Sequence, residues 1–184
     1  SLRVGQSETY GTVEDLLKEA EMVVFWASNP EGTSGAYGSF EGTIRRKWLK
    51  ELDIDIVHVD PFYNDSCQFL GGKWLPTKPT SSPALAMAIA YVWIKENLYD
   101  KDFVKNRTIG FDKWKDYILG KEDKVEKTPE WAAKETGLSA KDIRALARKW
   151  GNRKVYLAAG GWGNGHGGAL SLIHISEPTR QSLI

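Results

Sequence analysis

Three short runs rich in apolar residues most constrain the fold, because each is bounded by turn signals and is too short for a typical core helix. The runs cover residues 22–27, 54–59 and 155–159, and the first of them is continuously apolar. Such runs are typical of parallel strands that are buried on both faces. Helix patterns fill the intervals between them. The order of strands and helices therefore predicts an α/β fold with a mostly parallel sheet and flanking helices.

The helix patterns begin at residues whose side-chain oxygens commonly cap helices. The capping residues are Thr12, Ser39, Ser82, Thr128 and Ser139. The helix after Ser82 is expected to reach about residue 97 and is apolar nearly all round, which predicts a central position. Shorter helices are expected near residues 102–106 and 111–119, whereas residues 62–82 are expected to be irregular.

Two of these helices carry an apolar stripe at helical spacing, which predicts a buried face. The stripe of the helix after Ser39 consists of Phe40, Ile44, Trp48 and Leu52, with Leu49 beside them. The stripe of the helix after Ser139 consists of Ile143, Leu146, Ala147 and Trp150. We also expect Trp114 and Trp131 to lie in the core.

The composition argues against several classes of protein. The 25 Lys and Arg residues balance 24 Asp and Glu residues, which removes the usual electrostatic argument for binding nucleic acid or an anionic membrane. The single cysteine, Cys67, forbids an internal disulfide and a cysteine-based metal site within this chain, so we interpret it as a small buried thiol. The longest nearly apolar run, residues 83–94, is too short to span a bilayer.

The last residues differ in character from the rest of the chain. Residues 170–180 read LSLIHISEPTR, which matches the translation of a transposase adapter used in sequencing libraries. We therefore interpret residues 170–184 as a non-native tail and exclude them from reasoning about the fold. Residues 1–169 are then expected to be an interior fragment of a longer protein.

A glycine-rich loop at residues 28–38 joins the first predicted strand to a helix, as in nucleotide-binding turns. Gly32, Gly35 and Gly38 would let the backbone approach a diphosphate. Asp60 ends the next strand 22 residues after Gly38, near the distance at which an acid meets ribose hydroxyls in dinucleotide-binding folds. Together with the loop after Ala159, these segments would form the carboxyl edge of a Rossmann-like sheet. The glycine spacing is not the standard Gly-x-Gly-x-x-Gly, so an NAD-type domain and a plain loop with an Asp-Pro turn both stay open.

A series of short sequence blocks runs in a fixed order along nearly all of residues 10–168. The first are Trp-Ala-Ser-Asn-Pro-Glu-Gly-Thr at 26–33, His-Val-Asp-Pro at 58–61 and Pro-Thr-Lys-Pro-Thr-Ser-Ser-Pro-Ala-Leu at 76–85. Further blocks lie at residues 98–104, 108–112, 127–132 and 143–147. In this order they resemble the molybdopterin oxidoreductases of the dimethyl sulfoxide reductase family. Residues 34–38, 88–94 and 160–168 are most similar to members that transfer hydroxyl groups between aromatic rings.

The resemblance implies a cofactor, bis-molybdopterin guanine dinucleotide with molybdenum or tungsten, of which this domain would hold one dinucleotide. The residues that would contact its pterin–diphosphate end are Ser28, Asn29, Pro30 and Thr33. Asp60 would bind ribose hydroxyls, with His58 and Pro61 shaping the turn. The guanine would be framed by Pro79, Thr80 and Ser82, and the chain would return to the pterin at Gly160, Gly161 and Trp162.

One position departs from the family pattern. The family commonly has Asp where this chain has Ser82, and a carboxylate could accept two hydrogen bonds from guanine, whereas a hydroxyl offers no charge-assisted pair. Ser82 is therefore equally interpreted as a helix cap. His58 is compatible with a packed strand end, and His166 with a solvated loop.

The resemblance also implies a function for the parent protein. The parent would be the catalytic subunit of an oxidoreductase or hydroxyltransferase that moves hydroxyl groups between polyhydroxylated aromatics, with an S- or N-oxide reductase as the alternative. No catalytic or metal-ligating residue is assigned in this chain, and the fragment alone is expected to be an inactive α/β binding module. The implied partners are a small-molecule substrate and an iron–sulfur electron-transfer subunit. A cytoplasmic location is expected, or a periplasmic one for an oxide reductase.

Overall fold

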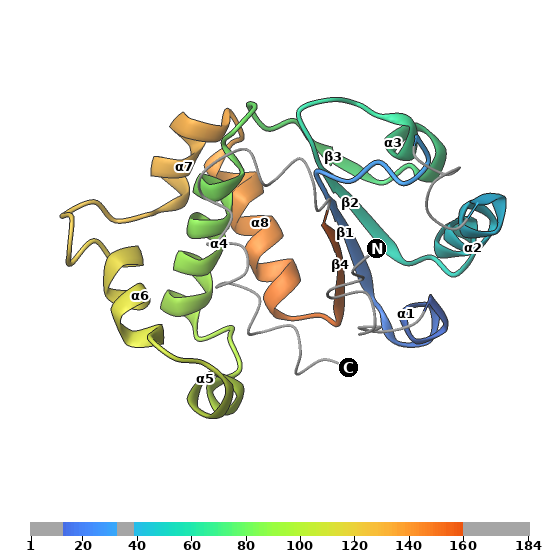
Figure 1. The fold of residues 1–184 in the computed structure, drawn as a ribbon. Helices are drawn as coiled ribbons and strands as arrows, with labels where there is room; N and C mark the ends of the chain where they lie inside the picture. Colours follow the sequence, from blue (N-terminus) through green and yellow to red (C-terminus); the bar gives the residue numbers. More distant parts are fainter. Residues whose placement is uncertain (1–12, 33–38, 160–184) are drawn as a thin grey trace, which may run out of the picture.

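The computed structural model describes residues 13–32 and 39–159 of this chain, and it confirms an alternating α/β fold (Figure 1). The strands are β1 (Met22–Trp26), β2 (Asp55–Val59), β3 (Lys73–Leu75) and β4 (Val155–Ala159). The first helices are α1 (Val13–Glu19), α2 (Ser39–Glu51), α3 (Asp65–Leu70) and α4 (Ser82–Glu96). They are followed by α5 (Lys101–Arg107), α6 (Phe111–Ile118), α7 (Pro129–Thr136) and α8 (Ala140–Gly151).

The four described strands form one parallel sheet in the order β3-β2-β1-β4. At its carboxyl edge Trp26 of β1 lies opposite both Val59 of β2 and Ala159 of β4. Val59 in turn lies opposite Leu75 of β3. All four strands therefore end at the same edge, which for β1, β2 and β4 agrees with the predicted parallel sheet.

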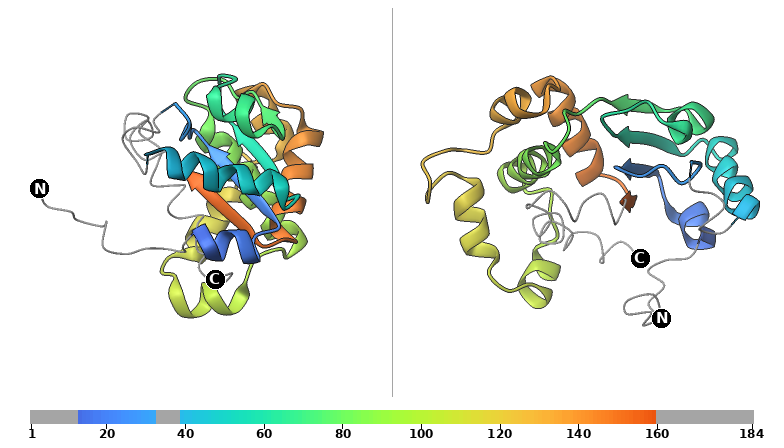
Figure 2. Two further views of the ribbon diagram at one scale, coloured as in Figure 1. Left: turned by 90° about the vertical axis from the view of Figure 1, so that its right-hand side faces the viewer. Right: turned by 45° about the horizontal axis from the view of Figure 1, so that its top comes forward.

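Helices cover both faces of this sheet (Figures 1 and 2). On one face, alternate residues of β1 (Met22, Val24 and Trp26) pack in a core cluster with α4, α7 and α8. On the other face, Val23 and Phe25 pack with residues of α1, α2 and α3. Strand β1 is thus buried on both sides, which explains why its sequence is continuously apolar.

Helix α4 is central, as its apolar sequence predicts. Ten of its residues, among them Leu85, Ala88 and Ile89, are buried. It contacts α7 and α8, while its other side packs against Ile118 of α6. Complete burial of each large aliphatic side chain stabilises the fold by about 1.5–3 kcal/mol. No helix among the described residues is long and apolar enough to cross a membrane.

The expectation that residues 62–82 are irregular is wrong, because they contain α3 and β3. The side chain of Asn64 caps α3 by accepting a hydrogen bond from the backbone N–H of Cys67 at 3.0 Å. Strand β3 pairs with only three residues of β2. A helix of six residues and a strand of three are too short to display a period, so the sequence pattern does not reveal them.

The predicted buried stripe of α2 is wrong at three positions, whereas the side chain of Phe40 lies outside the described residues. Leu49 is only 2% exposed and packs on the sheet, but Ile44, Trp48 and Leu52 are 56%, 42% and 54% exposed. These three side chains lie on the flank of α2 that faces away from the sheet, because a helix of this kind buries only one side against a flat layer. The predicted stripe of α8, in contrast, is confirmed as buried, including Trp150. Trp114 and Trp131 are half-buried.

Two of the predicted helix caps are confirmed and one is shifted. The hydroxyl of Thr128 accepts from the N–H of Trp131 at 3.1 Å, and that of Ser139 accepts from the N–H of Asp142 at 3.0 Å. In α4, however, Ser81 takes the N-cap position without a side-chain cap bond. Ser82 is instead the first helical residue, which leaves its side chain available for another contact.

Gly72, which precedes β3, offers a test of how this strand is positioned. Its φ is +93°, and an added Cβ would lie 2.3 Å from the carbonyl oxygen of Ile56. We expect Gly72→Ala to lower the free energy of unfolding by about 2–4 kcal/mol, because strain and a backbone clash act together. Gly110→Ala, at φ +82° with open space around the new methyl group, should cost only about 1–2 kcal/mol. Urea denaturation followed by tryptophan fluorescence measures both, and equal losses would contradict the assigned position of β3.

Candidate functional site

Three segments that are far apart in the sequence meet at the carboxyl edge of the sheet. The N–H of Ala27, just after β1, donates to the carbonyl of Val59 at 2.9 Å, so the loops after β1 and β2 begin side by side. The indole Nε1 of Trp26 donates to Oγ of Ser82 at 3.1 Å, which joins the start of α4 to the end of β1. Residues 28–32 and 60–61 therefore lie at one edge of the sheet, as expected, and Ser82 adjoins the end of β1, whereas the binding of a cofactor by these residues stays a prediction. The loop that follows β4 lies outside the described residues.

Asn29 organises the loop after β1. Its Oδ1 accepts hydrogen bonds from the N–H of Gly32 at 3.2 Å and from the N–H and Oγ of Ser66 at 3.1 and 2.9 Å. Its Nδ2 donates to Asp65 at 3.1 Å. A Cβ on Gly32 would lie 2.4 Å from this Nδ2, so the loop is closely packed around the amide. Asn29 therefore ties the loop to the first turn of α3.

Glu31 fixes the same loop to α2. Its backbone N–H donates to Oγ of Ser66 at 3.1 Å, and its carboxylate accepts from Thr43 at 2.6 Å and forms an ion pair with Arg46. Ser66 is fully buried and bridges Asn29 and Glu31. Sequence reasoning missed Ser66 because α3 was not expected, and a lone serine in a loop carries no signal of its own.

Asp60 is half-buried and fixes the turn after β2. One carboxylate oxygen accepts from the N–H of Phe62 at 2.9 Å, and the other accepts from Nδ2 of Asn64 at 3.2 Å. The indole of Trp74 donates to the carbonyl of Asp60 at 2.9 Å. A carboxylate has about four acceptor positions, so two stay available for a ligand. Pro61 is half-buried beside it.

His58 lies in the core and does not face solvent. Its side chain is 1% exposed and stacks on Phe25 with ring centroids 5.1 Å apart. Nε2 donates to the carbonyl of Gly71 at 2.9 Å, which assigns the proton to that nitrogen. Nδ1 has no hydrogen-bond partner among the described residues. Burial lowers the pKa of His58 from its usual value near 6.5, so the ring is neutral at pH 7. This geometry agrees with a residue that shapes the turn.

Two residues at the edge have a left-handed backbone although they are not glycine. Ala27 has φ +47° and Thr80 has φ +65°. A positive φ is strained for a β-branched side chain such as threonine. Pro79 and Thr80 are exposed, and Ser82 is half-buried. The Ser82 hydroxyl accepts from Trp26, so its own hydrogen is free to donate to a ligand.

The remaining candidates are placed as follows. Cys67 is confirmed as a buried thiol whose pKa is raised by burial. Within the described ranges, no group of three or more His, Cys, Asp or Glu side chains could hold a metal ion. The candidates that lie outside the described residues are Thr33, Gly35, Gly38, Gly160, Gly161, Trp162 and His166.

Comparison with known proteins decides the family. The chain matches the molybdopterin oxidoreductases over residues 4–175. It belongs to the molybdopterin oxidoreductase family. Family membership implies a molybdopterin cofactor that carries molybdenum or tungsten.

Several relatives of this molybdopterin oxidoreductase chain are much longer proteins. The chain is 50% identical to the pyrogallol hydroxytransferase large subunit of Pelobacter acidigallici, over 98% of the chain and 20% of that protein. It is 34% identical to the dimethyl sulfoxide/trimethylamine N-oxide reductase of Rhodobacter capsulatus, over 87% of the chain and 20% of that protein. The chain thus spans about a fifth of the length of these relatives. The family match runs six residues past residue 169, and the interpretation of residues 170–184 as a non-native tail stays a prediction.

The fold of this family member is also found in a solved structure. Acetylene hydratase from Pelobacter acetylenicus superimposes with a TM-score of 0.68 over 90% of the chain and 22% of that protein, at 21% identity. The resemblance shows that the α/β fold is shared.

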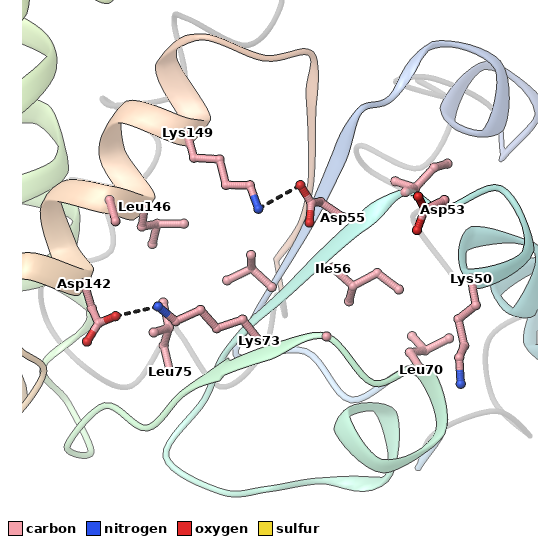
Figure 3. A pocket seen from close by; sticks show the side chains of 14 residues that line it. Lys50, Asp53, Asp55, Ile56, Leu70, Lys73, Leu75, Asp142, Leu146 and Lys149 are labelled. Atoms are coloured by element: carbon pink, nitrogen blue, oxygen red, sulfur yellow. Dashed lines mark hydrogen bonds and ion pairs between the residues drawn. The ribbon is translucent and has the colours of Figure 1, made fainter.

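A pocket of the molybdopterin oxidoreductase chain lies beside β2, β3 and α8 (Figure 3). It has a volume of about 510 Å³ and is lined by residues that include Asp55 and Lys73, the first residues of β2 and β3. Ion pairs Lys73–Asp142 and Lys149–Asp55 join its sheet side to α8. The charges of these four residues are compensated within the protein, and none of the candidate residues lies here.

The burial of His58 predicts a pH dependence of stability. Because the folded state disfavours protonated His58, the unfolded state binds more protons as the pH falls through 6.5, the usual pKa. We therefore expect the free energy of unfolding to decrease from pH 7.5 to pH 5.5. His58→Gln keeps an N–H donor but removes the titrating ring, so its decrease over this range should be smaller. Urea denaturation at several pH values measures both slopes, and identical slopes would show that His58 does not titrate in this way.

Proposed function

We propose that this chain is the part of a molybdenum or tungsten enzyme subunit that binds one pyranopterin guanine dinucleotide at the carboxyl edge of its sheet. The observation that carries the proposal is the meeting of the Asn29 loop, the Asp60 turn and the start of α4 at that edge. In open α/β sheets, ligands bind at the carboxyl ends of parallel strands.

The chemistry of the edge fits such a ligand. Asp60 keeps acceptor positions for the hydroxyls of a ribose, and a carboxylate is a strong acceptor for them. The loop of residues 28–32 is held in place by Asn29 and Glu31, whose polar side-chain atoms bond within the protein. The backbone of this loop is then the part that approaches the diphosphate. Ser28 and Pro30 are half-buried at its start.

The proposal gives the individual residues the roles that the family resemblance implies. Asn29 holds the loop for the pterin–diphosphate end, with Ser28, Pro30 and Thr33 as the contacting residues. Asp60 binds the ribose, while His58 and Pro61 support its turn from the core side. The guanine lies against Pro79, Thr80 and Ser82, and Oγ of Ser82, which already accepts from Trp26, has a second acceptor position for a guanine N–H but lacks the charge of the family Asp. Gly160, Gly161 and Trp162 complete the pterin region.

The parent enzyme transfers hydroxyl groups between polyhydroxylated aromatic rings in this proposal. The higher identity to the pyrogallol hydroxytransferase large subunit, 50% against 34% for the oxide reductase, supports this choice over reduction of S- or N-oxides. When bound, the metal supplies the two-electron and oxygen-transfer chemistry, and the residues of this chain bind and orient the cofactor. The name of that relative as a large subunit also supports a partner subunit, for which an iron–sulfur protein is the proposed class. A cytoplasmic location is part of the same proposal.

The cofactor assignment is tested on the full-length subunit. We expect purified enzyme to contain molybdenum or tungsten and to release about two GMP per metal on acid hydrolysis, since each dinucleotide carries one guanosine monophosphate. Asp60→Asn should lower the retained GMP and metal about tenfold, because a charged hydrogen-bond acceptor contributes roughly 1.5–3 kcal/mol. Asp53→Asn, at the amino edge, is the matched control and should retain both. Absence of metal and GMP from active wild-type enzyme would refute the proposal.

The substrate class is tested separately on the same enzyme. We expect transfer of hydroxyl groups between trihydroxybenzenes and no reduction of dimethyl sulfoxide or trimethylamine N-oxide with a dye electron donor. Liquid chromatography of the aromatic products and oxidation of the dye measure the two reactions. Oxide reduction without hydroxyl transfer would favour the alternative.

A further inference from the structure

Phe62 is an exposed aromatic residue held beside Asp60. Its side chain is 72% exposed, although a phenylalanine ring is usually buried. Its backbone N–H donates to the Asp60 carboxylate at 2.9 Å. The phenyl ring is therefore attached to the same tight turn as the carboxylate that we propose binds the ribose.

The turn that carries Phe62 is fixed on several sides. Asn64 donates to the second oxygen of Asp60 and also caps α3, while Trp74 donates to the Asp60 carbonyl. The next residue, Tyr63, packs edge-on against Trp74 with ring centroids 5.3 Å apart. Tyr63 thus serves to anchor the turn, whereas no ring contact of Phe62 occurs among the described residues. The exposed ring is therefore presented by a rigid turn and does not belong to a loose loop.

We infer that Phe62 stacks on the guanine base of the bound dinucleotide, an inference that rests on the proposed function. A ribose held by Asp60 places its base within one sugar length of the same turn, because the base is bonded directly to the ribose. A nucleoside offers two kinds of contact, its ribose hydroxyls and the flat π-face of its base. The Asp60 carboxylate accepts from the hydroxyls, and the aromatic ring beside it stacks on the base. Stacking does not distinguish the bases, so Phe62 supplies affinity and orientation.

This arrangement compensates for the charge-assisted pair of hydrogen bonds that Ser82 does not offer. The Ser82 hydroxyl accepts from Trp26 and offers no charge to the base. In this chain, stacking of Phe62 on the face of the base therefore contributes more to binding than hydrogen bonds to the edge of the base do. The ligand class is a purine nucleoside diphosphate joined to the pterin.

The experiment uses the full-length enzyme and four variants: Phe62→Ala, Phe62→Leu, Phe62→Tyr and, as the matched control, Phe69→Ala. Phe69 lies near the end of α3, is 39% exposed and does not belong to the Asp60 turn. The readout is the rate at which GMP-containing cofactor and metal are lost in mild urea. The melting temperature of the cofactor-free subunit is measured in parallel.

Loss of cofactor should be about 5- to 150-fold faster in Phe62→Ala and nearly as fast in Phe62→Leu, because leucine restores apolar bulk without a π-face. Phe62→Tyr and Phe69→Ala should retain the wild-type rate. If leucine performs as well as phenylalanine, or if alanine lowers the melting temperature of the cofactor-free subunit, the ring packs on protein and the inference is overturned. Wild-type enzyme without GMP would instead refute the proposed function itself.

Discussion

The parallel pairing of β1 with both β2 and β4 is the constraint on which the rest of the described structure depends. Because the three strands are in register at Trp26, Val59 and Ala159, their following loops all start at one edge. The pairing is stable only because helices cover both faces of β1, so the central α4 and the outer α2 are equally required. The place of the candidate site is therefore a consequence of core packing.

Side-chain hydrogen bonds, more than glycine flexibility, give this edge its shape. Asn29 and Ser66 join the first loop to α3, Asp60 closes the second turn, and Trp26 bonds the start of α4. The residues that the family pattern singles out thus divide into two kinds. Asn29 and His58 bond mainly within the protein and set geometry, whereas Asp60 and Ser82 keep hydrogen-bonding capacity for a ligand.

Patterns long enough to show a period were predictive. The buried stripe of α8, the apolar α4 and the three longer strands follow from residue patterns alone, because burial on a regular element repeats every two or about four residues. The short α3 and β3 were missed for want of a period, and they carry Ser66 and Trp74, which hold the site together. The prediction that the stripe of α2 is buried failed, because spacing shows that apolar residues share one side of a helix but not which side meets the sheet.

The sequence by itself determined the fold class, the family and the identity of the edge at which the strands end, because alternation of elements and ordered motifs are local properties of the chain. Only the tertiary structure decided which side-chain atoms of those motifs can still contact a ligand. Oγ of Ser82 accepts from an indole 56 positions away, His58 is enclosed by Phe25 and Gly71, and Phe62 is left exposed. Such contacts join residues that are distant along the chain, and their distances are set by packing of the whole sheet.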